Sequence, residues 1–143
     1  MTIRPYEESD EAGVAALWRE VFPDAPLWNH PETDIHRKLT VQRELFFVAK
    51  AQPESASESE IIGTAMGGFD GHRGWVYYVA VNPRLRRKGI GKALMERVER
   101  GLIEIGCPKL NLQVRADNHT VISFYRRLGY NVEERASLSK RLE

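Results

Sequence analysis

The sequence predicts one mixed α/β domain in which strands and helices alternate along the chain. The residues of Trp75–Val81 are apolar on both faces, which is typical of a central strand that is covered on both sides. From Gly89 to Ile105 the apolar residues keep helical spacing. A length of 143 residues, with 42% hydrophobic and 29% charged residues, suits one globular domain, so we expect residues 1–143 to form a single domain.

The first third of the chain predicts one strand and two helices. Thr2–Tyr6 has the pattern of a short strand, and Ser9 or Asp10 then provides the N-cap of a helix. The apolar residues of this helix repeat at i, i+3, i+4 and i+7, namely Val14, Leu17, Trp18 and Val21. Phe22–Pro31 is a proline-containing loop, and a weaker helix is expected from about Glu32 to Gln42.

Three strands follow in the middle of the chain. Aromatic and branched residues predict a strand over Leu45–Ala51, and the polar, acidic segment Pro53–Glu60 predicts a solvated turn. Ile61–Phe69 and Trp75–Val81 then form two strands, because the glycine-bracketed segment Asp70–Gly74 between them has the length of a hairpin loop.

The last third alternates again between helices and strands. Gly106 stands where the long helix needs a left-handed C-terminal cap. Lys109–Arg115 alternates like a strand, and Asp117 or Asn118 caps a helix that stops at Gly129. Two closing strands are expected, over Tyr130–Glu134 and Ala136–Leu142. The predicted order is therefore β-α-α-β-β-β-α-β-α-β-β.

Charge and composition argue against several classes of protein. A net charge of +1 provides no global field for nucleic acid or an anionic membrane, so we expect neither as a partner. The one cysteine, Cys107, excludes an intramolecular disulfide and suits the reducing cytoplasm. The first twenty residues lack the apolar run of a signal peptide. The four histidines are scattered and no paired cysteines accompany them, so we expect no metal.

The segment NPRLRRKGIGKALM, residues 82–95, has the pattern of an anion-binding site. It follows the central strand, and its glycines open the long helix, whose first N–H groups have no partner within the helix and carry the positive end of the macrodipole. Gly89 and Gly91 allow a phosphate to approach the backbone closely. Five basic side chains add charge around it, namely Arg84, Arg86, Arg87, Lys88 and Lys92.

Two other phosphate-binding motifs do not match this segment. A P-loop requires glycine where Arg86 stands and serine or threonine where Ala93 stands. The dinucleotide fingerprint requires a third glycine where Leu94 stands and an acidic residue near Asn111. The segment therefore indicates a different phosphate-containing ligand.

Two motifs in this part of the chain resemble the GNAT superfamily of acetyl-CoA-dependent N-acetyltransferases. Arg86-x-x-Gly89-x-Gly91 follows a strand and opens a helix, as does the acetyl-CoA motif of that family. Asn118, Phe124-Tyr125 and Leu128-Gly129-Tyr130 resemble its second signature. The two motifs span Val79 to Tyr130 in the order of the family, and the order of predicted elements is similar over essentially the whole chain.

The resemblance implies a GNAT-like domain with a central mixed, mostly antiparallel sheet flanked by about four helices. It implies that the strands Trp75–Val81 and Lys109–Arg115 splay apart, so that the pantetheine arm of acetyl-CoA pairs with the backbone around Val79–Val81. The loop before the long helix would then hold the pyrophosphate. The cosubstrate-binding positions so assigned are Val79, Ala80, Val81, Arg86, Arg87, Lys88, Gly89, Ile90, Gly91, Lys92 and Asn118.

Few protein groups are needed for the chemistry that the resemblance implies, because a thioester is already activated and an amine is a good nucleophile. A backbone N–H at Val81 or its neighbour is the candidate donor to the developing oxyanion. Tyr125 stands where the family places a tyrosine near the departing sulfur, although its spacing also suits core packing. Asn118 either contacts the pantetheine or caps its helix.

The acceptor side carries no sharp motif, but five residues are candidates. In the family the region between the first two helices commonly overhangs the acceptor amine. Trp28 would form a wall against the substrate or fill the core, and Glu32 and Asp34 would attract an ammonium group or favour a helix start. Tyr77 and Tyr78 lie on the central strand, where one of them should face the acceptor.

The sequence therefore predicts an enzyme that transfers an acetyl group from acetyl-CoA directly to a primary amine of a small molecule or a peptide. A sensor that binds acyl-CoA without turnover is the alternative. The identity of the amine, the acyl chain and a homodimer all stay open.

Overall fold

The computed structural model describes residues 1–26, 30–51 and 60–143. Trp28 and most of the predicted turn Pro53–Glu60 lie outside the described residues. Contacts within the chain group into two compact units, residues 1–112 and residues 113–143, and each is described by itself. A single domain over the whole chain stays a prediction.

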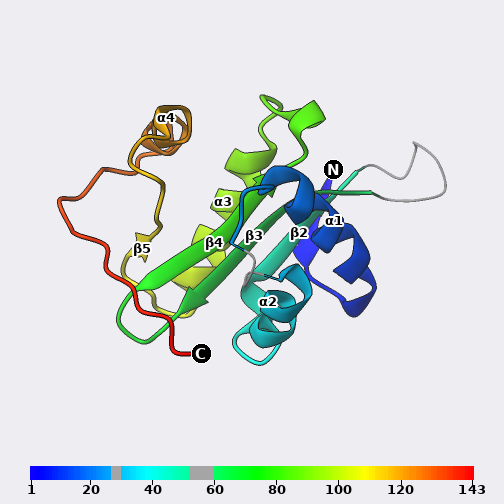
Figure 1. Ribbon diagram of the computed structural model, residues 1–143, viewed down its shortest axis with the longest axis horizontal. Coiled ribbons are helices and arrows are strands. Elements are labelled where there is room, and N and C mark those ends of the chain that lie inside the picture. The colour runs from blue at the N-terminus through cyan, green and yellow to red at the C-terminus, as the bar shows by residue number, and fades with distance from the viewer. Residues whose placement is uncertain (27–29, 52–59) are drawn as a thin grey trace. The chain divides into compact units, whose positions relative to one another are not determined.

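The first unit contains a five-stranded sheet in the order β1-β2-β3-β4-β5 (Figure 1). Its strands are β1 Thr2–Pro5, β2 Phe46–Lys50, β3 Ile61–Phe69, β4 Gly74–Val81 and β5 Leu110–Asn111. The first four pair antiparallel with their neighbours, and β5 pairs parallel with β4. The sheet is therefore mixed and mostly antiparallel, with β4 between β3 and β5, which confirms the predicted fold class.

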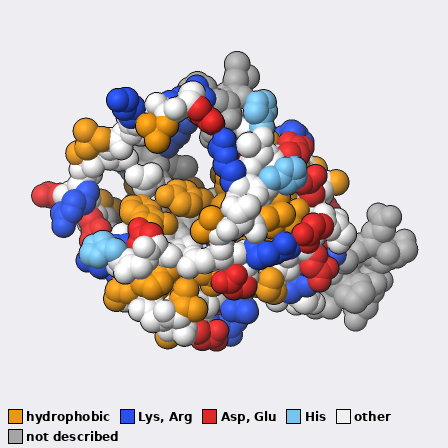
Figure 2. All heavy atoms as spheres, turned by 90° about the horizontal axis from the view of Figure 1, so that it is seen from below, with side chains coloured by type: hydrophobic (Ala, Val, Ile, Leu, Met, Phe, Trp, Pro, Cys, Tyr) orange, Lys and Arg blue, Asp and Glu red, His pale blue; other side chains and the backbone are white. Residues whose placement is uncertain are grey.

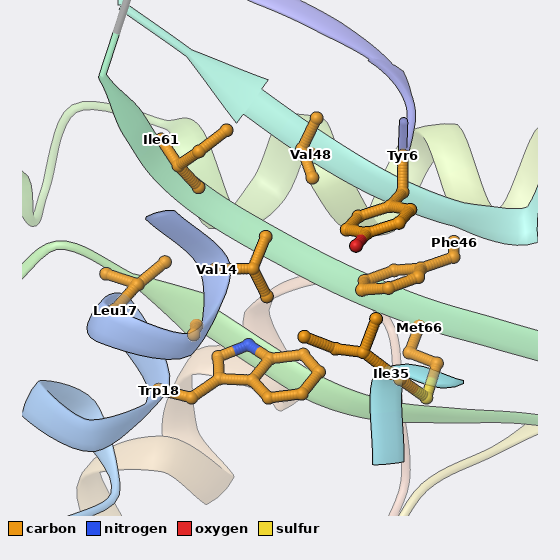
Figure 3. Packing of buried hydrophobic residues seen from close by; sticks show 10 residues of the cluster. Tyr6, Val14, Leu17, Trp18, Ile35, Phe46, Val48, Ile61 and Met66 are labelled. Atoms are coloured by element: carbon orange, nitrogen blue, oxygen red, sulfur yellow. The ribbon is translucent and has the colours of Figure 1, made fainter. Parts of the chain in front are cut away.

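Three of the four α-helices among the described residues belong to this unit: α1 Glu11–Val21, α2 Pro31–Lys38 and α3 Ile90–Glu104. The helices α1 and α2 cover one face of the sheet, where their buried side chains form a core with alternate residues of β2 (Figure 3). The other face packs against α3, because a Cβ built on Gly63 would meet Leu94 and one built on Gly67 would meet Val98. This two-sided burial explains why β2 and β3 are apolar along most of their length.

The helix α2 ends at Lys38, four residues before the predicted end at Gln42. Gln42 adopts a left-handed backbone with φ 49°. Its side-chain amide donates to the carbonyl of Phe69 (3.0 Å) and accepts from the N–H of Phe69 (2.7 Å), at the end of β3. These tertiary bonds have no signature in the local sequence, so helical periodicity overestimated the length of α2.

The second unit contains α4, His119–Arg127, and Asn118 caps it as predicted. The closing strands over Tyr130–Glu134 and Ala136–Leu142 are not formed, and the predicted strand over Lys109–Arg115 is reduced to the two residues of β5. A strand requires a neighbouring strand for its backbone groups. Residues 131–143 are exposed throughout, so alternation in this segment buries no face.

Candidate functional site

The outer edge of β4 is open over most of its length. The parallel pairing with β5 includes only Gly74 and Trp75. Beyond Trp75, no strand among the described residues pairs with this edge. Pairing with β5 therefore covers only the start of β4, and the divergence of the two strands stays a prediction.

The direction of the backbone groups along this edge follows from the ladder between β3 and β4. The N–H of Asn82 donates to the carbonyl of Ile62 at 2.8 Å, so Asn82 faces β3. Because alternate residues of a strand direct their N–H and C=O groups to opposite sides, Val81 faces the open edge, and we expect Val79, two residues earlier, to face it as well. Ala80 lies between them as the partner of Thr64, with its backbone turned toward β3 and its side chain buried.

A β-bulge lies at Tyr78 and Val79, opposite Ala65 of β3. Met66 is the partner of Tyr77 and Thr64 is the partner of Ala80, so that one residue of β3 lies opposite two residues of β4. Within the bulge Tyr78 has a left-handed φ of 51°. Such a conformation is rare for a residue with a large side chain and indicates strain that the surroundings must hold.

The side chain of Tyr78 is held on the face of the sheet that α1 and α2 cover. Its ring stacks on Trp18 with centroids 3.7 Å apart, and Phe22 packs edge-on at 5.6 Å. Its hydroxyl donates to Asp34 of α2 at 2.5 Å. Burial, together with this bond to a carboxylate, raises the pKa of Tyr78 well above its ordinary value.

Tyr77 lies on the same face, because its partner Met66 packs in the core beneath α1 and α2. Simple alternation would place the side chains of Tyr77 and Tyr78 on opposite faces, but the bulge places both on the same face of the sheet. Tyr77 is 52% exposed, and its ring stacks near Trp75 with centroids 6.4 Å apart. Trp75 was not among the predicted site residues, although the period of two along a strand would have placed it beside Tyr77.

Glu32 is bound by another side chain of the first unit. Arg19 of α1 donates to both of its carboxylate oxygens, at 2.7 and 2.9 Å. This hydrogen bond from Arg19 is the main reason that the pKa of Glu32 is lowered. Asp34 is the other predicted acid, and it faces the hydroxyl of Tyr78 instead.

The loop after β4 presents backbone N–H groups at the start of α3. Asn82 accepts from the N–H of Arg84 at 3.0 Å and so caps a short 3-10 turn, Pro83–Leu85. Arg87 and Gly89 then adopt left-handed conformations, with φ of 64° and 79°. The first bond of the helix runs from Ala93 N–H to Gly89 C=O at 3.0 Å. The N–H groups of residues 89–92 precede this bond and lie outside the helical ladder.

Charge around this helix start is positive. The first turn of α3 contains no acidic residue, and the neighbouring Arg86, Arg87 and Lys88 are exposed. Lys92 lies 4.0 Å from Glu96. A Cβ built on Gly89 would meet no protein atom within 4 Å, so the space beside this backbone is open. The combination of free N–H groups, open space and basic side chains fits a phosphate group.

The charges on the face seen in Figure 2 are mixed, with Lys and Arg side chains lying among Asp and Glu side chains. That face presents no continuous basic surface. Within the described ranges, no three His, Cys, Asp or Glu residues gather as metal ligands would. No helix in the described part of the chain is both long and apolar enough to cross a bilayer.

Asn118 and Tyr125 belong to the second unit. The side chain of Asn118 accepts from the N–H of Val121 at 3.2 Å, which is the capping role. Tyr125 is 8% exposed and makes edge-on contacts with Phe124 and Tyr130, at centroid distances of 4.9 and 5.7 Å. Burial raises the pKa of Tyr125 to about 12, so its hydroxyl stays protonated at neutral pH.

Comparisons with known proteins show the family of the chain. The model of the acetyltransferase (GNAT) family matches residues 12–130. An acetyltransferase of Yersinia enterocolitica is 45% identical over 142 residues, which cover 99% of this chain and 96% of the relative.

Two solved N-acetyltransferase structures are also similar. Naa20 of Chaetomium thermophilum, in complex with a bisubstrate analogue, has a TM-score of 0.75 and 27% identity, over 92% of this chain and 72% of that one. The ribosomal-protein-S18-alanine N-acetyltransferase of Escherichia coli has a TM-score of 0.72 and 25% identity, over 91% and 77%. The chain belongs to the GNAT family of acetyltransferases and is an acyltransferase.

Proposed function

We propose that this acyltransferase moves an acetyl group from acetyl-CoA to a primary amine by direct transfer in a ternary complex. The main support is that two features follow each other along the chain. The open backbone edge at Val79 and Val81 leads through Asn82 directly into the positively charged start of α3. An extended arm that ends in a pyrophosphate matches that order of features.

The residues present fit acetyl-CoA in two respects. The amide groups of its pantetheine arm would pair with the backbone of Val79 and Val81, which faces the open edge. Its pyrophosphate would accept from the N–H groups of residues 89–92, with Arg86, Arg87 and Lys88 around it. Ala80 contributes less than its neighbours, because its backbone groups are directed toward β3.

The transfer requires the amine nitrogen to attack the thioester carbonyl carbon. The carbon–sulfur bond then breaks, CoA departs as a thiolate, and the amine nitrogen loses a proton. The N–H of Val81 is the proposed donor to the carbonyl oxygen while it carries negative charge. Positioning at this edge supplies much of the rate, since the nucleophile and the thioester are intrinsically reactive.

Tyr125 is proposed to donate a hydrogen bond to the departing sulfur. Its pKa of about 12 makes complete transfer of the proton to a thiolate of pKa ~8.5 uphill by about 5 kcal/mol. A hydrogen bond to the sulfur avoids that cost and still stabilises the developing charge. Tyr125 therefore assists without itself becoming charged.

On the acceptor side, the two predicted acids already have protein partners. Glu32 is bound by Arg19, and Asp34 accepts from Tyr78. We therefore propose that no dedicated base acts, and that the acceptor amine has a low pKa. A peptide α-amine, with a pKa of ~8, is about a quarter neutral at pH 7.4, whereas a lysine amine is neutral in only about one part in a thousand. The name of the E. coli relative, an alanine N-acetyltransferase, supports a peptide terminus.

The proposal also includes a cytoplasmic location, which the single cysteine supports. Incubating the protein with acetyl-CoA and a panel of peptides, amino acids, polyamines and other amines tests the activity. Free thiol release reports turnover, and mass spectrometry identifies the acetylated product. We expect turnover to be fastest with α-amines of peptides. Tight binding of acetyl-CoA with no acetylated product from any amine would refute the transfer.

A further inference from the structure

The bulge in β4 holds Tyr78 in a conformation that it would not adopt alone. A left-handed backbone is unfavourable for an aromatic residue and persists only where surrounding contacts hold it. Tyr78 is also the last residue before the edge at Val79 and Val81. The contacts that hold Tyr78 therefore determine how this edge is presented.

The carbonyl of Tyr78 has a specific side-chain partner in the first unit. The hydroxyl of Thr64, on β3, donates to it at 2.8 Å. The same hydroxyl accepts from the indole Nε1–H of Trp18, on α1, at 2.8 Å. Thr64 is fully buried, with an exposed fraction of 0%. One hydroxyl thus uses its donor and an acceptor site to join α1, β3 and β4.

This arrangement solves a problem that the bulge creates. The extra residue removes one carbonyl from the regular ladder, and a buried carbonyl without a partner is unfavourable. Valine or isoleucine would suit a buried strand equally well by size, but neither has a hydroxyl. Thr64 has this hydroxyl and bonds through it to the backbone of the bulge.

We propose that Thr64 is a positioning residue for acyl transfer. By holding the Tyr78 carbonyl, Thr64 fixes the bulge, and the bulge directs the backbone of Val79 and Val81 to the open edge. Trp18 supports it by orienting the hydroxyl and by stacking on the ring of Tyr78. The inference rests on the proposed function, because it assigns the transfer step to that edge.

The test compares substitutions at Thr64 with a core substitution on the neighbouring strand β2. Thr64→Val keeps the shape and removes the hydroxyl, whereas Thr64→Ser keeps the hydroxyl. Val48→Ala, at the β2 position that pairs with Thr64, destabilises the same core but keeps the Thr64 hydroxyl. The register of β3 and β4 is measured in the free proteins from cross-strand nuclear Overhauser effects. Turnover is measured well below each melting temperature, with acetyl-CoA and the best amine of the panel.

We expect Thr64→Val to change the register around Tyr78 and to lower kcat at least about tenfold, by more than it raises the Kd for acetyl-CoA. Thr64→Ser and Val48→Ala should keep the register and stay within about threefold of the wild-type kcat. Should Thr64→Val not fold, Thr64→Cys, with its weaker S–H donor, replaces it and should lower kcat relative to Thr64→Ser.

An unchanged register in Thr64→Val overturns the proposal, whatever the turnover shows. A loss of kcat no larger than that of Val48→Ala also overturns it, since the hydroxyl would then contribute only to stability. If the wild-type protein acetylates no amine, the proposed function fails separately. The register of the free variants still decides whether Thr64 holds the bulge.

Discussion

Replacing Gly89 by alanine should weaken acetyl-CoA binding, and the structure provides a matched control at the other end of the same helix. Gly89 precedes α3 with φ 79°, and Gly106 follows it with φ 83°. A Cβ built at either position would meet no protein atom within 4 Å. The two substitutions therefore introduce the same backbone strain and no steric clash in the free protein.

The two variants distinguish an effect on stability from an effect on acetyl-CoA binding. Left-handed backbone costs about 1–2 kcal/mol for a residue with a Cβ, so both variants should unfold about 3–8 °C lower than the wild type. Only the methyl group at Gly89 enters the open space beside the N–H groups of residues 89–92. We expect Gly89→Ala to raise the Kd for acetyl-CoA at least about tenfold, or about 1.4 kcal/mol, and Gly106→Ala to leave it unchanged.

Isothermal titration calorimetry with acetyl-CoA measures the two Kd values, and differential scanning calorimetry measures the two melting temperatures. A Kd that stays at the wild-type value in both variants would refute the assignment of the phosphate to the start of α3. A Kd raised equally in both would show that strain in α3, and not the position of the methyl group, controls binding.

Three further perturbations test the other parts of the site. Arg86→Glu should raise the Kd for acetyl-CoA at least about tenfold, and the increase should be smaller at high salt. Arg100→Glu, on the exposed side of α3, should leave this Kd unchanged. Calorimetry at two ionic strengths measures both effects. Tyr125→Phe should lower kcat with little change in that Kd, and the wild type should show no tyrosine limb between pH 7 and 10, because the phenol with a pKa of about 12 stays neutral there. In Glu32→Gln and Asp34→Asn, the plot of kcat/KM against pH should still follow the amine pKa of the acceptor. If the wild type instead shows an enzyme pKa of ~6–7 and one of the two substitutions abolishes it, the substituted residue is the base.

The helix start and the loop before it were predictable because their signals are local. Gly89 with its left-handed φ, a strand that ends at Val81, and apolar residues at helical spacing all lie within one short segment. Each follows from backbone sterics or from helical geometry, without knowledge of distant residues. The capping role of Asn118 was predictable for the same reason.

The strands at the end of the chain were not predictable in this way. Alternation over Lys109–Arg115 is a necessary property of a half-buried strand, but it does not provide the neighbouring strand. Only Leu110 and Asn111 find a partner, on β4. The acid at Glu32 shows a similar limit, since its ion pair joins two helices whose facing residues are set by tertiary packing.

The bulge is the feature of the candidate site that depends most on distant residues. Counting back from Asn82 in steps of two gives Ala80, whose backbone also faces β3, and this leaves Val81 and Val79 for the open edge only if the strand is regular between them. One residue earlier that regularity ends, and Tyr78 turns to join Tyr77 on the face beneath α1 and α2. Nothing in the run of apolar residues from Trp75 to Val81 marks the position of the extra residue. The hydroxyl of Thr64, on another strand, holds the bulge, and for this reason only the structure could identify Thr64.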